Sequence, residues 1–278
     1  MEKAMDFTTL EIVQKFPNSP VFHLFLNNPS RHNALTLPFF SEFPKAISLL
    51  DESPSVRLIV LSARGNNFCS GIDVSVLDVI SKPQQSNDAG RIREQLYRQI
   101  KGLQESTKAL EQCRKPIIAE INGACIGGAI DIVAACDIRY CTEKAFFVVK
   151  EVDMAITADI GALQRLPRIV GFGNAMEMIL TCRKINGREA KELGLISKVF
   201  ASKEEMEEGV RVIAEAIAAK SPLTVAGTKQ VMLKSRDLTI NQGLDYVAVW
   251  NAAMLLSDDL DESIAAHIQK RKPIYAKL

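Results

Sequence analysis

Three carboxylates are the residues of this sequence best placed to do chemistry. Asp131 ends the segment NGACIGGAID, and Glu151 and Asp159 flank the mainly apolar segment VDMAITA. Acidic side chains that share an apolar pocket resist ionising together, so one can stay protonated near neutral pH while another is ionised. The three residues are therefore candidates for moving a proton as acid and base.

Two glycine-containing turns come just before these acids. In NGACIGGAID a strand pattern gives way to Gly127 and Gly128 and then to a helical pattern. A helix N-terminus presents free N–H groups at a positive end, which suits an oxyanion. In FCSGID, Gly71 would let Ile72 direct its N–H towards the same point, so two loops could form an oxyanion hole. The glycine pair alone could equally serve only a tight turn.

The elements that must position these residues alternate along the first part of the chain. Strand patterns occur at residues 10–13, 21–26, 56–61, 117–121, 137–141 and 145–149, and the first two flank a PNSP turn that predicts a hairpin. Helical patterns occur at 37–50, 92–113 and 130–136, and residues 82–88 read as a polar loop. Such alternation predicts a mixed α/β fold.

Helical patterns dominate the last part of the chain, at residues 203–220, 222–234 and 241–271, after a short strand pattern at 197–200. We therefore predict an α/β core over residues 1–200 and a helical region over 201–278. Amphipathic helices in such a region pack on their own core or on a neighbouring subunit, which predicts a role in oligomerisation.

Composition narrows the possible partners. The chain has 34 Lys and Arg against 33 Asp and Glu, which predicts neither a nucleic-acid groove nor binding to an anionic membrane surface. The most apolar region, residues 117–138, contains three acids and so predicts no membrane span. The six cysteines are scattered without zinc-ligand spacing, and the sequence has no GxSxG elbow, so we predict no metal site and no serine hydrolase.

Four segments together resemble the signatures of the crotonase (enoyl-CoA hydratase/isomerase) superfamily. They are NNPSRHNAL, FCSGID, NGACIGGAID and KEVDMAITADIGALQRL, and the resemblance covers residues 8 to 270 in the family's order and spacing. It implies a spiral of β–β–α repeats followed by helices, an acyl-CoA thioester substrate, and an oxyanion hole from the amides of Ile72 and Gly128. It also implies a homotrimer or homohexamer, and no cofactor beyond the CoA of the substrate.

The acids indicate which branch of the superfamily the chain resembles. Members that hydrate enoyl-CoA carry glutamates where this chain has Asp131 and Glu151, and a glycine at Asp159. The set found here is similar to the delta-3,5-delta-2,4-dienoyl-CoA isomerases of fatty-acid β-oxidation. Moving two conjugated double bonds towards the thioester requires a proton to leave carbon 2 and another to reach carbon 6. Glu151 is the candidate at carbon 2 and Asp159 at carbon 6, with Asp131 close enough to tune them, and the acid and base roles could exchange.

Other interpretations of the same residues stay open. The enzyme could hydrate enoyl-CoA or shift a single double bond, or the chain could be a non-catalytic scaffold that binds CoA esters. Singly, Asp131 could complement a helix N-terminus, Glu151 could lie in a solvated loop, and Asp159 could cap a helix that begins near residue 162.

The final residues predict a location. Ala276, Lys277 and Leu278 form a small-basic-Leu tripeptide similar to the SKL address of peroxisomal proteins. We therefore expect a peroxisomal protein whose import receptor reads this tripeptide.

Overall fold

Two sheets carry the loops of the candidate site. The computed structural model describes residues 7–81 and 88–278. One sheet has the order β1-β2-β3-β4-β6-β9, and a smaller one has the order β5-β7-β8. The strands are β1 Leu10–Val13, β2 Val21–Leu26, β3 Leu58–Ala63, β4 Ile117–Ile121, β5 Ala124–Ile126, β6 Ile138–Thr142, β7 Phe146–Val148, β8 Ile185–Asn186 and β9 Lys198–Phe200.

The pairing of the strands confirms the predicted hairpin and the mixed α/β class. β1 and β2 are antiparallel, whereas β2, β3, β4, β6 and β9 are parallel neighbours. A parallel sheet is covered on both faces, which explains why β3 and β4 are buried at every residue and apolar at all but Ser62 and Glu120. β4 of the large sheet, β5 of the small sheet and α4 (Gly128–Ala135) follow one another as a β–β–α unit.

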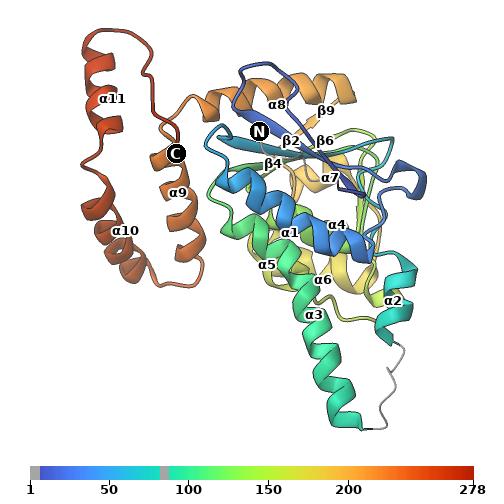
Figure 1. The fold of residues 1–278 in the computed structure, drawn as a ribbon. Coiled ribbons are helices and arrows are strands. Elements are labelled where there is room, and N and C mark those ends of the chain that lie inside the picture. Colours follow the sequence, from blue (N-terminus) through green and yellow to red (C-terminus); the bar gives the residue numbers. More distant parts are fainter. Residues whose placement is uncertain (1–6, 82–87) are drawn as a thin grey trace.

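Helices cover both faces of the large sheet (Figure 1). The remaining helices are α1 Leu37–Glu52, α2 Val74–Ser81, α3 Ala89–Gln112, α5 Ala162–Val170, α6 Phe172–Thr181, α7 Gly187–Glu192, α8 Lys203–Ala218, α9 Pro222–Ser235, α10 Ile240–Met254 and α11 Asp258–Ile268. Alternate strand residues face the two sides, so one core lies beneath α8 and the larger core lies beneath α1, α3 and α4.

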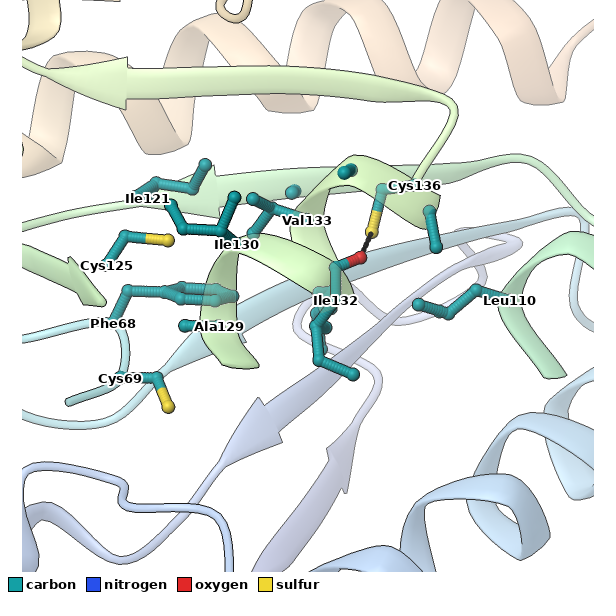
Figure 2. Close-up of a cluster of buried hydrophobic side chains, with 14 of the residues drawn as sticks. Phe68, Cys69, Leu110, Ile121, Cys125, Ala129, Ile130, Ile132, Val133 and Cys136 are labelled. Atoms are coloured by element: carbon teal, nitrogen blue, oxygen red, sulfur yellow. Dashed lines mark hydrogen bonds between the residues drawn. The ribbon is translucent and has the colours of Figure 1, made fainter. Parts of the chain in front are cut away.

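Helix α4 is the most enclosed element near the site. All of its residues are buried, and Figure 2 shows its side chains among Phe68, Cys125 and Leu110. A helix that is apolar on every side belongs in a core, where close packing permits little movement. The residues at its start, Gly128 and Asp131, are therefore held rigidly.

The C-terminal helices differ from the prediction in one respect. The single helix predicted over residues 241–271 is wrong, because the structure has α10 and α11 with extended backbone at Ser257 (φ −127°, ψ 153°) between them. Three acids in the first turn of α11 favour a new N-terminus there. Asp259, one of them, also accepts a 2.5 Å hydrogen bond from Ser221 at the start of α9.

The helices after residue 200 do not all occupy the same place. α8 packs on the large sheet, whereas α9, α10 and α11 stand beside the core (Figure 1). The division into domains at residue 200 stays a prediction. Of the loop predicted at 82–88, only Asp88 belongs to the described residues, where it caps α3 by accepting from the N–H groups of Gly90 and Arg91. In the described parts of the chain, no helix is long and apolar enough to cross a membrane.

Candidate active site

The turn between β5 and α4 presents a free amide beside a carboxylate. Gly127 has φ +53° and ψ −127°, a conformation that side chains disfavour. A Cβ atom there would lie 3.4 Å from Oε1 of Glu151, so glycine also leaves room for that carboxylate. The N–H of Gly127 donates to the carbonyl of Val148, which directs the chain so that Gly128 begins the helix with its N–H unused.

The second loop brings Ile72 against the first. Gly71 has φ +98°, and a Cβ atom there would lie only 2.9 Å from the carbonyl oxygen of Ile126, so the loops approach closely. Leu35 binds the residues on both sides of Ile72 through 2.8 and 3.0 Å backbone hydrogen bonds. Within residues 7–81 and 88–278, the N–H groups of Ile72 and Gly128 have no protein acceptor.

An asparagine that the sequence analysis did not single out supports this loop. Asn33 is 3% exposed and adopts φ +54°. Its Oδ1 accepts from the N–H of Asn28, and its Nδ2 donates to the carbonyls of Arg64 and Asn67. One side chain thus joins NNPSRHNAL to the turn that precedes FCSGID. Its place in the NNPSRHNAL segment was the only sequence signal for this role.

Asp131 is the most deeply buried of the three acids, at 1% exposed. Burial raises its pKa to about 7, and the nearby carboxylates of Glu151 and Asp159 add to the shift. Its Oδ1 accepts a 2.6 Å hydrogen bond from the N–H of Ala162, the first residue of α5. Asp131 lies in the first turn of α4 and also accepts from the first N–H group of α5, so it complements the N-terminus of a second helix.

Glu151 and Asp159 belong to the irregular chain between β7 and α5. Glu151 is partly buried, and its Oε2 is fully enclosed without a hydrogen-bond partner in the described structure. Burial raises its pKa, and the charge of Asp159 contributes. Asp159 is also partly buried, and burial raises its pKa as well. It does not cap α5, because the N–H of Ala162 bonds to Asp131.

A neighbouring acid shows the contrast with an ordinary surface residue. Asp153 is exposed and pairs with Lys150 at 2.5 Å, which lowers its pKa. The solvated-loop interpretation therefore fits Asp153 and not Glu151. The other acid set aside on sequence grounds, Asp137, pairs with Lys229 and accepts from the N–H of Ile117. Both have structural partners away from the carboxylates of the site.

The arrangement suits acid–base chemistry on a carbonyl compound. Burial raises the pKa of all three carboxylates, that of Asp131 to about 7, and within the described residues two backbone amides without an acceptor lie on adjoining loops. In the part of the chain that the structure describes, no group of three His, Cys, Asp or Glu side chains is arranged to hold a metal ion. Acid–base chemistry by the carboxyl groups of Asp131, Glu151 and Asp159 stays a prediction that this geometry suits.

Comparison with known proteins places the chain in a family. The family model described as enoyl-CoA hydratase/isomerase matches residues 17–277. A protein of Arabidopsis thaliana named "Delta(3,5)-Delta(2,4)-dienoyl-CoA isomerase, peroxisomal" is 60% identical over 273 residues, which are 98% of each chain. A mouse protein named as the mitochondrial isomerase is 41% identical over 90% of this chain and 77% of its own. The chain belongs to the enoyl-CoA hydratase/isomerase family.

Solved structures agree on the fold. An enoyl-CoA hydratase from Bacillus anthracis superposes with a TM-score of 0.85 at 29% identity, covering 96% of this chain and 99% of that one. The superfamily resemblance and the fold class are therefore confirmed. The roles of Ile72, Gly128, Asp131, Glu151 and Asp159 stay predictions, which the geometry above makes specific.

Proposed function

We propose that this chain is a delta-3,5-delta-2,4-dienoyl-CoA isomerase of fatty-acid β-oxidation. The observation that carries the proposal is the third carboxylate: Asp159 lies close enough to Asp131 and Glu151 to affect their pKa values. An isomerase that moves two conjugated double bonds must remove a proton at carbon 2 and add one at carbon 6, which one carboxylate could not easily do. The name of the 60% identical relative supports the same reaction.

The reaction would proceed through an enolate. Glu151 removes a proton from carbon 2, and the electrons of that C–H bond form the double bond between carbons 2 and 3. The bond between carbons 3 and 4 moves to carbons 4 and 5, and the bond between carbons 5 and 6 takes a proton from Asp159 at carbon 6. Between these steps the negative charge rests on the thioester oxygen, which the amides of Ile72 and Gly128 would bind.

The proposed steps set the protonation states of the two reacting acids. Glu151 must start ionised and Asp159 protonated, and the reaction exchanges these states. Because the pKa of Asp131 is raised to about 7, Asp131 can hold a proton beside Glu151 and keep the site from carrying three charges. The hydrogen bond that Oδ1 of Asp131 accepts from the N–H of Ala162 holds this carboxyl group in place.

An absorbance assay tests the proposal. Purified protein given a 3,5-dienoyl-CoA should produce the absorbance of a 2,4-dienoyl-CoA. Asp159→Asn should lower kcat by about 100-fold or more, as for the loss of a general acid. Asp153→Asn is the matched control, because that acid is exposed and pairs with Lys150, and it should keep the parental rate.

The same assay separates the other interpretations. Loss of absorbance from an enoyl-CoA, with no reaction of the diene, would make the chain a hydratase. Tight binding of CoA esters without any turnover would make it a scaffold. A diene isomerase whose Asp159→Asn variant is unimpaired would refute the role of Asp159.

The comparison with the Arabidopsis thaliana relative also gives the cellular location. The 60% identical relative is named peroxisomal, and we assign this chain to the peroxisome. We further propose that an import receptor binds Ala276, Lys277 and Leu278. Arg57 donates to the carbonyls of Tyr275 and Ala276, while the side chains of Ala276 and Lys277 are exposed. A fluorescent fusion should enter peroxisomes with this tripeptide and stay outside without it; equal import would exclude the tripeptide as the address.

The C-terminal helices support a homo-oligomer, which we propose to be a trimer or a hexamer. None of the residues of α10 is buried, and large apolar side chains on α9, α10 and α11 face solvent in the single chain. Exposed apolar surfaces of this kind mark interfaces. The exposed residues include Met232, Leu244, Val249, Leu256 and Ile268. Light scattering should give three or six times the 30.7 kDa chain mass, and a monomer would contradict the proposal.

A further inference from the structure

Asp159 is attached to backbone that has no regular structure of its own. Residues 156–161 lie between a short 3-10 helix and α5, and belong to neither a helix nor a strand. A group that must deliver a proton to one carbon atom needs its position fixed within a fraction of an ångström. The contacts that hold this segment therefore determine how well Asp159 can work.

Two side chains from one face of α3 bind this segment. Nε2 of Gln104 donates to the carbonyl of Asp159 at 2.7 Å, and Oγ1 of Thr107 donates to the carbonyl of Ile160 at 2.8 Å. The two side chains are three positions apart, so they stand next to each other on the helix. Two successive carbonyls are thus held by a single rigid helix.

The orientation of the Gln104 amide is itself determined. Its Oε1 accepts a 3.0 Å hydrogen bond from Nζ of Lys101, one turn earlier on α3. Only Nε2 is then free to point at Asp159. Thr107 is 1% exposed, so bulk water does not compete for its hydroxyl. The hydroxyl also reaches the carbonyl of Gln104 in its own helix at 3.1 Å, but the carbonyl of Ile160 is the nearer acceptor at 2.8 Å.

A third residue of the same face holds the end of the segment. Glu111 accepts two hydrogen bonds from Arg165, at 3.0 and 2.6 Å, and so locks the guanidinium in one place. Gly161 has φ +135°, and a Cβ atom there would lie 1.6 Å from Nη1 of Arg165. The guanidinium therefore lies directly on the backbone of Gly161.

Helix α4 holds the chain at Ala162, directly after this segment. The N–H of Ala162 bonds to Asp131, itself one of the proposed acids. The stretch from Asp159 to Ala162 is thus fixed by α3 on one side and by α4 on the other. The core already holds α3 and α4 in place, so both sets of contacts fix the segment to rigid helices.

We propose that Gln104 and Thr107 are positioning residues for Asp159, and that α3 sets where the proton for carbon 6 is delivered. The inference rests on the proposed isomerase function. Among the described residues, neither side chain hydrogen-bonds to the amides of Ile72 and Gly128 or to Glu151. Their loss should therefore affect proton delivery at carbon 6 and leave proton removal at carbon 2 in place.

Thr107→Val and Thr107→Ser are the matched pair of variants. Valine keeps the shape of threonine but lacks the hydroxyl, whereas serine keeps the hydroxyl. We expect Thr107→Val to lower kcat for the diene by about 10- to 100-fold with KM changed less than about threefold, since small displacements of reacting groups cost rates of this order. Thr107→Ser should restore most of kcat. Gln104→Leu, at a partly buried site, should reproduce the effect if Thr107→Val does not fold.

Isotope exchange distinguishes positioning from general damage. With substrate carrying deuterium at carbon 2, the parent enzyme should both isomerise it and exchange the label with water. In Thr107→Val and Gln104→Leu, exchange should persist while isomerisation falls. The ratio of the exchange rate to the isomerisation rate should therefore rise about tenfold or more in each variant. An unchanged kcat, or an equal loss of exchange and isomerisation, would overturn the proposal. If the parent enzyme fails to isomerise the diene at all, the proposed function has failed instead.

Discussion

Replacing Asp131 with asparagine should make the protein more stable at alkaline pH while it impairs catalysis. Asparagine keeps an oxygen that can accept from the N–H of Ala162, so the contact at the start of α5 can survive. What disappears is an acid whose pKa rises from 3.8 to about 7 on folding, through burial and then through the charge of Glu151.

The sign and size of the effect follow from linkage. A raised carboxyl pKa means that the native state keeps its proton where the unfolded state has lost it. The contribution of Asp131 is therefore fully present below pH 3.8, and it is lost as pH rises towards 7. Each pKa unit is worth about 1.4 kcal/mol, so the loss between pH 5 and pH 8 is about 3 kcal/mol. Asp131→Asn lacks this loss.

Urea unfolding at pH 5 and pH 8, at one fixed protein concentration, measures the difference. The free energy of unfolding of Asp131→Asn, relative to the parent, should increase by about 3 kcal/mol over that interval. Its kcat for the diene should be at least about tenfold lower, because an amide cannot share a proton with Glu151. Parallel stability profiles of the two proteins would refute the assignment of Asp131 as a buried acid with a raised pKa.

Three further changes test other parts of the structure. Within the described residues, the two buried carboxyl oxygens of Glu120 have no hydrogen-bond partner, and burial raises its pKa to about 7. Urea unfolding of Glu120→Gln should therefore show a gain of about 3 kcal/mol relative to the parent from pH 5 to pH 8, and a constant difference would contradict this. Gly127→Ala forces a side chain into φ +53° beside Glu151. Urea unfolding should show a loss of about 1–2 kcal/mol, and the diene assay should give a kcat at least about tenfold lower. An unchanged kcat would count against a role for this turn in binding the oxyanion. Lys229→Met removes an ion pair to Asp137 and two hydrogen bonds to backbone carbonyls. The free energy of unfolding in urea should therefore fall by about 3 kcal/mol. A decrease of less than about 1 kcal/mol would mean that this lysine does not anchor α9.

The elements nearest the site were predictable because strong local signals bound them. The strand at residues 117–121 follows a proline and is apolar except for Glu120, and the helix that begins at Ala162 follows a glycine. The two-residue β8 and three-residue β5 are too short to form a periodic pattern, so they went unnoticed. The break between α10 and α11 has only Ser257 and acidic residues to mark it, and the helical periodicity runs through it.

For the site, the residue types could be recognised from the sequence, whereas the long-range contacts that position them could not. The glycines and the acids carry their chemistry in their residue types, and for that reason they could be singled out. The hydrogen bond from Ala162 to Asp131 joins residues 31 positions apart, and that from Gln104 to Asp159 joins residues 55 positions apart. Such contacts depend on how whole helices pack, which no local pattern records. The support that Asn33 gives to the FCSGID loop was missed for the same reason.

The most direct test of the account is a crystal structure with a slowly reacting dienoyl-CoA analogue bound. The thioester oxygen should lie about 2.7–3.1 Å from both backbone nitrogens of Ile72 and Gly128, as in an oxyanion hole. Glu151 should lie against carbon 2 and Asp159 against carbon 6 of the acyl chain. A thioester oxygen bound elsewhere, or an acyl chain that leaves Asp159 out of contact with carbon 6, would contradict the account.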